Sequence, residues 1–171
     1  DRKKQSPKWQ RAVKTVDWIS SRLPIAGRYQ IWEFNENLES VLGGCLDCWQ
    51  EVADRDGLND AIANVKEIVP ANGTNMEQVF RAVTNMSSRP DNIFLITDGL
   101  PTLGARGPNN GYINAFQREE LFEDAVEELP SGIPVNIIML PISGDPAAAG
   151  AFWELARYTQ GAFIAPSKDW P

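Results

Sequence analysis

The side chains best suited to chemistry lie where an apolar segment ends in a carboxylate. Residues 93–97 form an unbroken run typical of a strand buried on both faces, and Asp98 and Gly99 follow it. In open α/β sheets, ligands bind at the carboxyl ends of the strands, so Asp98 lies where a site is expected. Aspartate before glycine is also common in turns, which keeps a purely structural role for Asp98 open.

A second candidate is Thr74, which precedes a segment whose apolar spacing predicts a helix. Residues 74–77 also match a capping box, in which the Thr74 hydroxyl and the Glu77 carboxylate each accept a hydrogen bond from a backbone amide. Thr74 and Asp98 are both expected at the same edge of a parallel sheet. Together they offer oxygen ligands to a cation, whereas Thr74 alone indicates a helix cap.

The two cysteines form the pattern Cys45-x-x-Cys48, which fits either a redox dithiol or a disulfide. A catalytic dithiol needs a low-pKa thiol at the start of a helix that follows a strand. Here the pair follows Gly43 and Gly44, after a predicted short edge strand at residues 41–42. The spacing therefore favours a structural or incidental pair over a catalytic one.

The composition excludes several classes of function. The chain has 171 residues, of which 43% are hydrophobic, a net charge of -7 and no histidine. An acidic chain without a basic patch does not favour nucleic acid as a partner, but it is compatible with binding a cation. The lack of histidine removes Ser-His-Asp and Cys-His catalysis and structural zinc sites. The phosphate-binding loop and the dinucleotide fingerprint are absent as well.

Strand and helix patterns alternate along the chain and predict an α/β fold, with a doubly wound, mostly parallel sheet flanked by helices. Ser6 is expected to cap the first helix, and Pro24 to stop it. Asp145 is expected to cap the last helix, with added negative charge beside a cation as the alternative. The pattern predicts helices over residues 6–23, 58–68, 74–86, 121–129 and 152–158, and strands over 28–34, 92–97, 135–140 and 162–165.

Three motifs carry a resemblance to a known family. They are Gly73-Thr74-Asn75 opening a helix, Ile-Thr-Asp-Gly at residues 96–99 ending a strand, and Leu-Ala-x-x-Thr-x-Gly-x-Phe-Ile at residues 155–164. These motifs follow one another in the order found in the von Willebrand factor A domain, also called the integrin I-like domain. The chain therefore resembles that family, in its bacterial stand-alone type. The resemblance covers nearly the whole chain and implies a single Rossmann-like domain over residues 1–171.

The resemblance implies a metal-ion-dependent adhesion site. Thr74 would offer its hydroxyl to a divalent cation, and Asp98 would act on the metal directly or through water. Oxygen ligands of this kind suit Mg²⁺, with Mn²⁺ and Ca²⁺ as alternatives. The implied function is cation-dependent protein binding, in adhesion or assembly, with a partner carboxylate on the metal and no enzymatic activity. Two alternatives stay open: a metal-dependent hydrolase using Asp98, and a thiol redox protein using Cys45 and Cys48.

One motif of the family is missing from these residues. The family's Asp-x-Ser-x-Ser, which supplies most direct ligands, does not occur, and Asp17-Trp18-Ile19-Ser20-Ser21 has the wrong spacing inside a predicted helix. Because the helix at Ser6 corresponds to the family's first helix, we expect the motif and its central strand to precede Asp1. The resemblance leaves localisation open between the cytoplasm and a membrane-anchored position facing the periplasm or cell exterior, the anchor lying outside these residues. It names neither the partner nor the oligomeric state.

Overall fold

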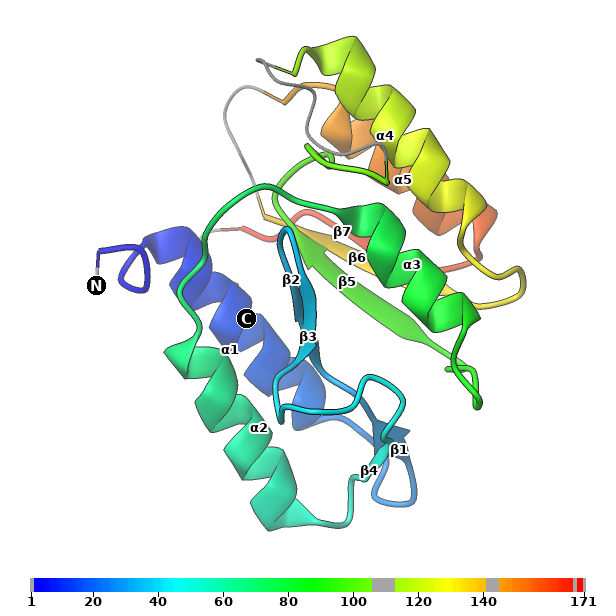
Figure 1. The fold of residues 1–171 in the computed structure, drawn as a ribbon. Coiled ribbons are helices and arrows are strands. Elements are labelled where there is room, and N and C mark those ends of the chain that lie inside the picture. The colour runs from blue at the N-terminus through cyan, green and yellow to red at the C-terminus, as the bar shows by residue number, and fades with distance from the viewer. Residues whose placement is uncertain (1, 106–112, 141–144, 168, 171) are drawn as a thin grey trace. The chain divides into compact units, whose positions relative to one another are not determined.

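The residues that the structure describes form a mixed α/β protein, with five helices and several small sheets among them (Figure 1). The computed structural model describes residues 2–105, 113–140, 145–167 and 169–170. It divides into two compact units. The first unit comprises Asp1–Glu33, Leu38–Ala71 and Lys168–Pro171, and the second comprises Phe34–Asn37 and Asn72–Ser167.

The second unit is built on a parallel sheet in the order β5-β6-β7. The register pairs Ile93 with Val135 at one end of β5 and Thr97 with Met139 at the other. All three strands confirm the sequence prediction, and their bounds are β5 Ile93–Thr97, β6 Val135–Met139 and β7 Phe163–Ile164. Strand β6 has a strand on each side, and four of its five residues are buried. The predicted burial of residues 93–97 on both faces is wrong, because Phe94 of β5 is 47% exposed. Among the described residues β5 is an edge strand.

In the described part of the second unit, three helices accompany the sheet, and each carries an apolar stripe that packs inward. They are α3 Met76–Thr84, α4 Ala115–Glu127 and α5 Ala148–Tyr158. Helix α3 packs against α4, and α5 packs against β6 and β7. The rings of Phe122 and Phe152 meet edge to face at 5.1 Å between centroids, which links α4 to α5. At the end of α5 the chain approaches β6 closely, since a Cβ on Gly161 would lie 2.0 Å from the Val135 carbonyl oxygen.

The first unit contains two helices that pack together, α1 Pro7–Ser20 and α2 Arg55–Glu67. The predicted cap of α1 is confirmed, because the Ser6 hydroxyl accepts a hydrogen bond from the Trp9 amide at 3.2 Å. The helix ends at Ser20, before the predicted end at Leu23. One cluster of buried residues in this unit consists of Tyr29, Val52, Leu58 and Ala61, and both helices bury further apolar side chains.

The strands of the first unit differ from the prediction. The segment 28–34 is not one strand but two, because it changes its pairing partner after Tyr29. Strand β1 (Arg28–Tyr29) pairs antiparallel with β4 (Gln50–Glu51). Strand β2 (Trp32–Phe34) pairs with β3 (Leu38–Ser40), and residues 35–37 connect them.

The predicted edge strand at residues 41–42 is wrong as well. Strand β3 ends at Ser40, where a turn begins in which the Gly43 amide donates to the Ser40 carbonyl at 2.8 Å. Gly43 and Gly44 both adopt positive φ, a conformation that glycine reaches at little cost and that does not continue a strand.

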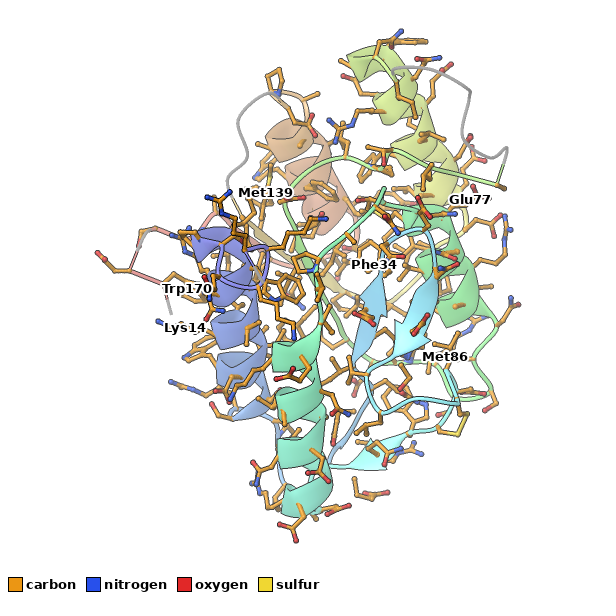
Figure 2. The ribbon with its side chains drawn as sticks, turned by 60° about the vertical axis from the view of Figure 1, so that its left-hand side comes forward. Lys14, Phe34, Glu77, Met86, Met139 and Trp170 are labelled. Atoms are coloured by element: carbon orange, nitrogen blue, oxygen red, sulfur yellow. A yellow bond between two sulfur atoms is a disulfide. The ribbon has the colours of Figure 1, made fainter. Side chains whose placement is uncertain are left out.

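Trp170 lies against α1 within the first unit (Figure 2). Its indole N–H donates to the Thr15 hydroxyl at 3.2 Å, and its ring meets Trp18 edge to face at 5.0 Å. The Arg22 guanidinium covers the Trp18 ring at 5.0 Å, a cation–π contact. An aromatic cluster therefore covers one side of α1.

Candidate functional site

The structure brings the Thr74 segment and the loop after β5 together. The Thr74 carbonyl accepts hydrogen bonds from the amides of Thr102 at 2.9 Å and Leu103 at 3.0 Å. In return, the Thr74 amide donates to the Thr102 hydroxyl at 2.9 Å. Asp98 directly follows β5 and is half-buried, as is Thr74. The two predicted site residues thus come from loops that are hydrogen-bonded to one another at the carboxyl end of the parallel sheet.

The capping box predicted for residues 74–77 is wrong. Helix α3 begins at Met76, and its N-cap is Asn75, whose side-chain oxygen accepts from the Gln78 amide at 3.2 Å. The start of the helix lies one residue later than the motif requires, so Thr74 falls outside the cap. The Thr74 hydroxyl therefore does not serve the start of α3.

Glu77 takes a different role, which sequence reasoning missed. Its side chain is buried, with 7% of the residue exposed, and its carboxylate accepts from the Ala105 amide at 2.6 Å (Figure 2). The same carboxylate pairs with Arg81, which also binds Glu128 at 2.8 Å. Glu77 thus ties the loop after β5 to α3. The signal available in the sequence was a carboxylate beside Met76 and Phe80, on the apolar stripe of a helix.

The buried Asp145 and the half-buried Arg118 form an ion-pair clamp on the same loop. The Asp145 carboxylate lies 2.7 Å from the Arg118 guanidinium and accepts from the Leu100 amide at 2.8 Å. Arg118 also donates to the Leu100 carbonyl and, at 3.4 Å, to the Pro101 carbonyl. Gly99 is required here, since a Cβ on it would lie 2.8 Å from an Asp145 carboxylate oxygen.

The predicted cap role of Asp145 is wrong. Helix α5 begins after Ala147 and has no side-chain cap. The Asp145 carboxylate is engaged by the Arg118 guanidinium and the Leu100 amide, both contributed by segments distant in sequence. Its negative charge is matched within the protein, so the alternative of a charge reserved for a cation loses its main support.

Charge pairing shifts two pKa values beside the site. The Arg81 guanidinium, through its hydrogen bond, lowers the pKa of the Glu128 carboxyl below its ordinary value. Glu128 in turn raises the pKa of Arg81. Both groups therefore stay charged across the neutral range, and the tie between α3 and the end of α4 persists there.

The ligand types at Thr74 and Asp98 fit a hard divalent cation, since a hydroxyl and a carboxylate both present oxygen. They fill part of a coordination shell, because Mg²⁺ takes about six oxygens, several of them from water. Among the described residues no group of three or more His, Cys, Asp and Glu side chains could hold a metal ion. A cation at Thr74 and Asp98 therefore depends on water or on further ligands.

Cys45 and Cys48 are joined in a disulfide, with 5.4 Å between their Cα atoms. The bond closes a loop between β3 and β4 in the first unit, and the next helix begins only at Arg55. Neither sulfur lies at a helix N-terminus, the position that lowers the pKa of a catalytic thiol. The placement agrees with the structural pair that the sequence favours.

No helix in the described ranges has both the length and the apolar character to cross a bilayer. Comparison with known proteins adds no assignment: no family model matches the chain, and no curated sequence matches it.

Proposed function

We propose that this chain is a von Willebrand factor A-like module that binds a protein partner through a divalent cation. The observation that carries the proposal is the direct hydrogen bonding between the Thr74 loop and the loop that follows Asp98. The order of helices and strands, and the parallel pairing of the last three strands, agree with the family's doubly wound arrangement. The module is proposed to bind and not to catalyse.

In the proposed site, Thr74 contributes a hydroxyl oxygen and Asp98 a carboxylate oxygen. When bound, Mg²⁺ supplies positive charge and an exchangeable position for a partner carboxylate. Glu77 and the Arg118–Asp145 pair do not bind the metal. They hold the loop after β5 at Ala105 and at Leu100, which limits how far Asp98 can move from Thr74.

The test is a calorimetric titration of the intact protein with Mg²⁺ and with Mn²⁺. Asp98→Ala and Thr74→Val are each expected to weaken binding by about tenfold or more, since even residues outside the direct ligand shell are worth roughly 10–100-fold. Thr74→Ser keeps the hydroxyl and should bind as the wild type does. Asp91→Ala removes an exposed carboxylate at the opposite end of β5, and should stay within about twofold.

Two results would count against this function. Unchanged metal affinity in both Asp98→Ala and Thr74→Val would remove the site. Equal losses in Thr74→Val and Thr74→Ser would show that the hydroxyl is not the group that matters. Turnover of an ester or phosphoester substrate that requires Asp98 would instead favour the hydrolase.

A further inference from the structure

A groove of about 730 Å³ lies between α4 and α5 in the second unit, away from Thr74 and Asp98 in the sequence. Its floor is apolar and includes Phe122 and Leu155, which are only 8% and 3% exposed. Val126 and Ala151 line it as well. A concave apolar floor between two helices is the kind of surface onto which a helical segment docks.

One wall of the groove is a line of carboxylates. Glu119, Glu123 and Glu127 lie four residues apart on α4, all three line the groove, and all three are exposed. In the part of the chain that the structure describes, none of them forms an ion pair. On the opposite wall, Glu154 pairs with Arg157 at 2.9 Å, so those two charges offset each other. The groove therefore carries a net negative charge that comes from α4.

This line of glutamates is unfavourable for its own helix. Like charges four residues apart on a helix repel each other. Glu127 is the last residue of α4, where the helix dipole favours a cation, and the last turn contains no basic residue. The stability of α4 thus gives no reason for the three carboxylates, and local rules broken in this way are expected at functional surfaces.

An aromatic side chain borders the same groove. Tyr158, on α5, is 80% exposed and lines the groove on the wall opposite the glutamates. Tyrosine is enriched at protein interfaces because its ring buries apolar area while its hydroxyl keeps a polar partner. The groove thus combines an apolar floor, an exposed aromatic ring and uncompensated negative charge.

We propose that the α4–α5 groove docks a basic amphipathic helix of a partner protein. The apolar side of that helix would pack on Val126, Ala151 and the Tyr158 ring, and its lysines and arginines would face the α4 glutamates. Charge complementarity selects this occupant, because an acidic or neutral helix would leave the three carboxylates unpaired. The groove shares no residue with the proposed metal site, so its binding requires no cation.

The probe is a fluorescent synthetic peptide of about 18 residues, roughly five helical turns. It carries leucine and phenylalanine on one face and lysine on the other, and binding is followed by anisotropy in EDTA. The test variant is Glu119→Gln, Glu123→Gln and Glu127→Gln combined. The control removes the same number of charges from exposed glutamates that do not line the groove, through Glu36→Gln, Glu51→Gln and Glu120→Gln.

The groove variant is expected to bind the peptide about tenfold more weakly, the sum of three modest ion pairs. The control should stay within about twofold. Tyr158→Ala should weaken binding about fivefold, as removal of an interface aromatic does. The melting temperature of the groove variant should stay unchanged or rise, because like-charge repulsion along α4 is removed.

Three outcomes would overturn the proposal. Equal weakening in the groove and control variants would mean that the peptide responds only to net charge. If a peptide with glutamate in place of lysine bound as tightly as the lysine peptide, charge complementarity would not select the partner. A lower melting temperature together with lost binding in the groove variant would assign the glutamates to the folding of α4.

Discussion

The two units differ in how they treat buried polar groups. In the second unit the buried carboxylates of Glu77 and Asp145 each have a guanidinium and a backbone amide as partners. Within the described residues, the buried side-chain nitrogen and oxygen atoms that lack a hydrogen bond all belong to the first unit. They are Trp9 Nε1, Tyr29 Oη, Gln30 Nε2 and Trp32 Nε1.

An unsatisfied buried polar atom costs roughly 1–3 kcal/mol, so this difference bears on stability and on specificity. Burial, and then the nearby Asp54 charge, also raise the pKa of the Tyr29 hydroxyl. The second unit uses its buried charges to fix the loop beside the candidate site. The first unit leaves four buried side-chain polar atoms without a hydrogen-bond partner among the described residues. The comparison indicates that the second unit is the one built around a fixed polar site.

The largest loss of stability is expected from breaking the Arg118–Asp145 clamp of the second unit. Asp145→Ala leaves the Arg118 guanidinium and the Leu100 amide without their carboxylate, and breaking a buried ion pair costs roughly 3–5 kcal/mol. Urea unfolding followed by far-UV circular dichroism measures the loss. Amide exchange in β5 and α5 should accelerate, whereas that in α2 should not.

The control for the clamp is Asp91→Ala, which removes an exposed carboxylate and should change stability by less than about 0.5 kcal/mol. The double variant Arg118→Met and Asp145→Ala should be less damaging than Asp145→Ala, because no unpaired charge stays buried. If Asp145→Ala behaves like Asp91→Ala, the contrast between the two units fails.

A smaller effect is expected from the disulfide of the first unit. Replacing Cys45 and Cys48 with serine opens a very short loop, for which chain entropy accounts for at most about 2 kcal/mol. Five of the six tryptophans lie in the first unit, so their fluorescence reports on its unfolding. Metal and peptide binding should not change, because both proposed sites lie in the second unit.

The informative comparison for the disulfide is wild type under oxidising and reducing conditions. The serine variant should match the reduced wild type in its tryptophan transition and show no further change on reduction. Loss of metal or peptide affinity in the serine variant would mean that the first unit takes part in binding, and the thiol redox alternative would gain support.

The smallest effect concerns an exposed ion pair of the first unit. The Lys4 ammonium, 2.9 Å away, lowers the pKa of Glu67. A carboxyl whose pKa is lower in the folded chain stabilises the fold above its unfolded pKa, and this contribution is lost as pH falls through the folded pKa. Lys4→Met should therefore flatten the fall in melting temperature on acidification.

Arg81→Met is the matched variant in the second unit, since Arg81 lowers the pKa of Glu128 as Lys4 lowers the pKa of Glu67. Arg81 also pairs with the buried Glu77, so its removal should affect stability at neutral pH as well as the acid side. If Lys4→Met changed the fall in melting temperature on acidification more than Arg81→Met does, the contrast between the units would be contradicted.

In the second unit the sequence alone determined where strands and helices occur, but not where each helix begins. The apolar spacing predicts helices over residues 121–129 and 152–158, whereas α4 begins six residues earlier, at Ala115, and α5 four residues earlier, at Ala148. The apolar runs at residues 93–97 and 135–139 are strands, and Met76, Phe80 and Val83 lie on the buried face of a helix as their spacing predicts. Such elements follow from periodicity within one segment, which is local information. The Ser6 cap follows in the same way from a local pattern.

Only the tertiary structure decided which partner each polar group takes. Asp145 pairs with Arg118, Glu77 binds the Ala105 amide, and Asn75 replaces Thr74 as the cap of α3. The split of residues 28–34 into two strands has the same origin, since β1 and β2 pair with different strands. Each local motif permitted several hydrogen-bonding partners, and the partner chosen depends on which distant segments the fold brings within bonding distance.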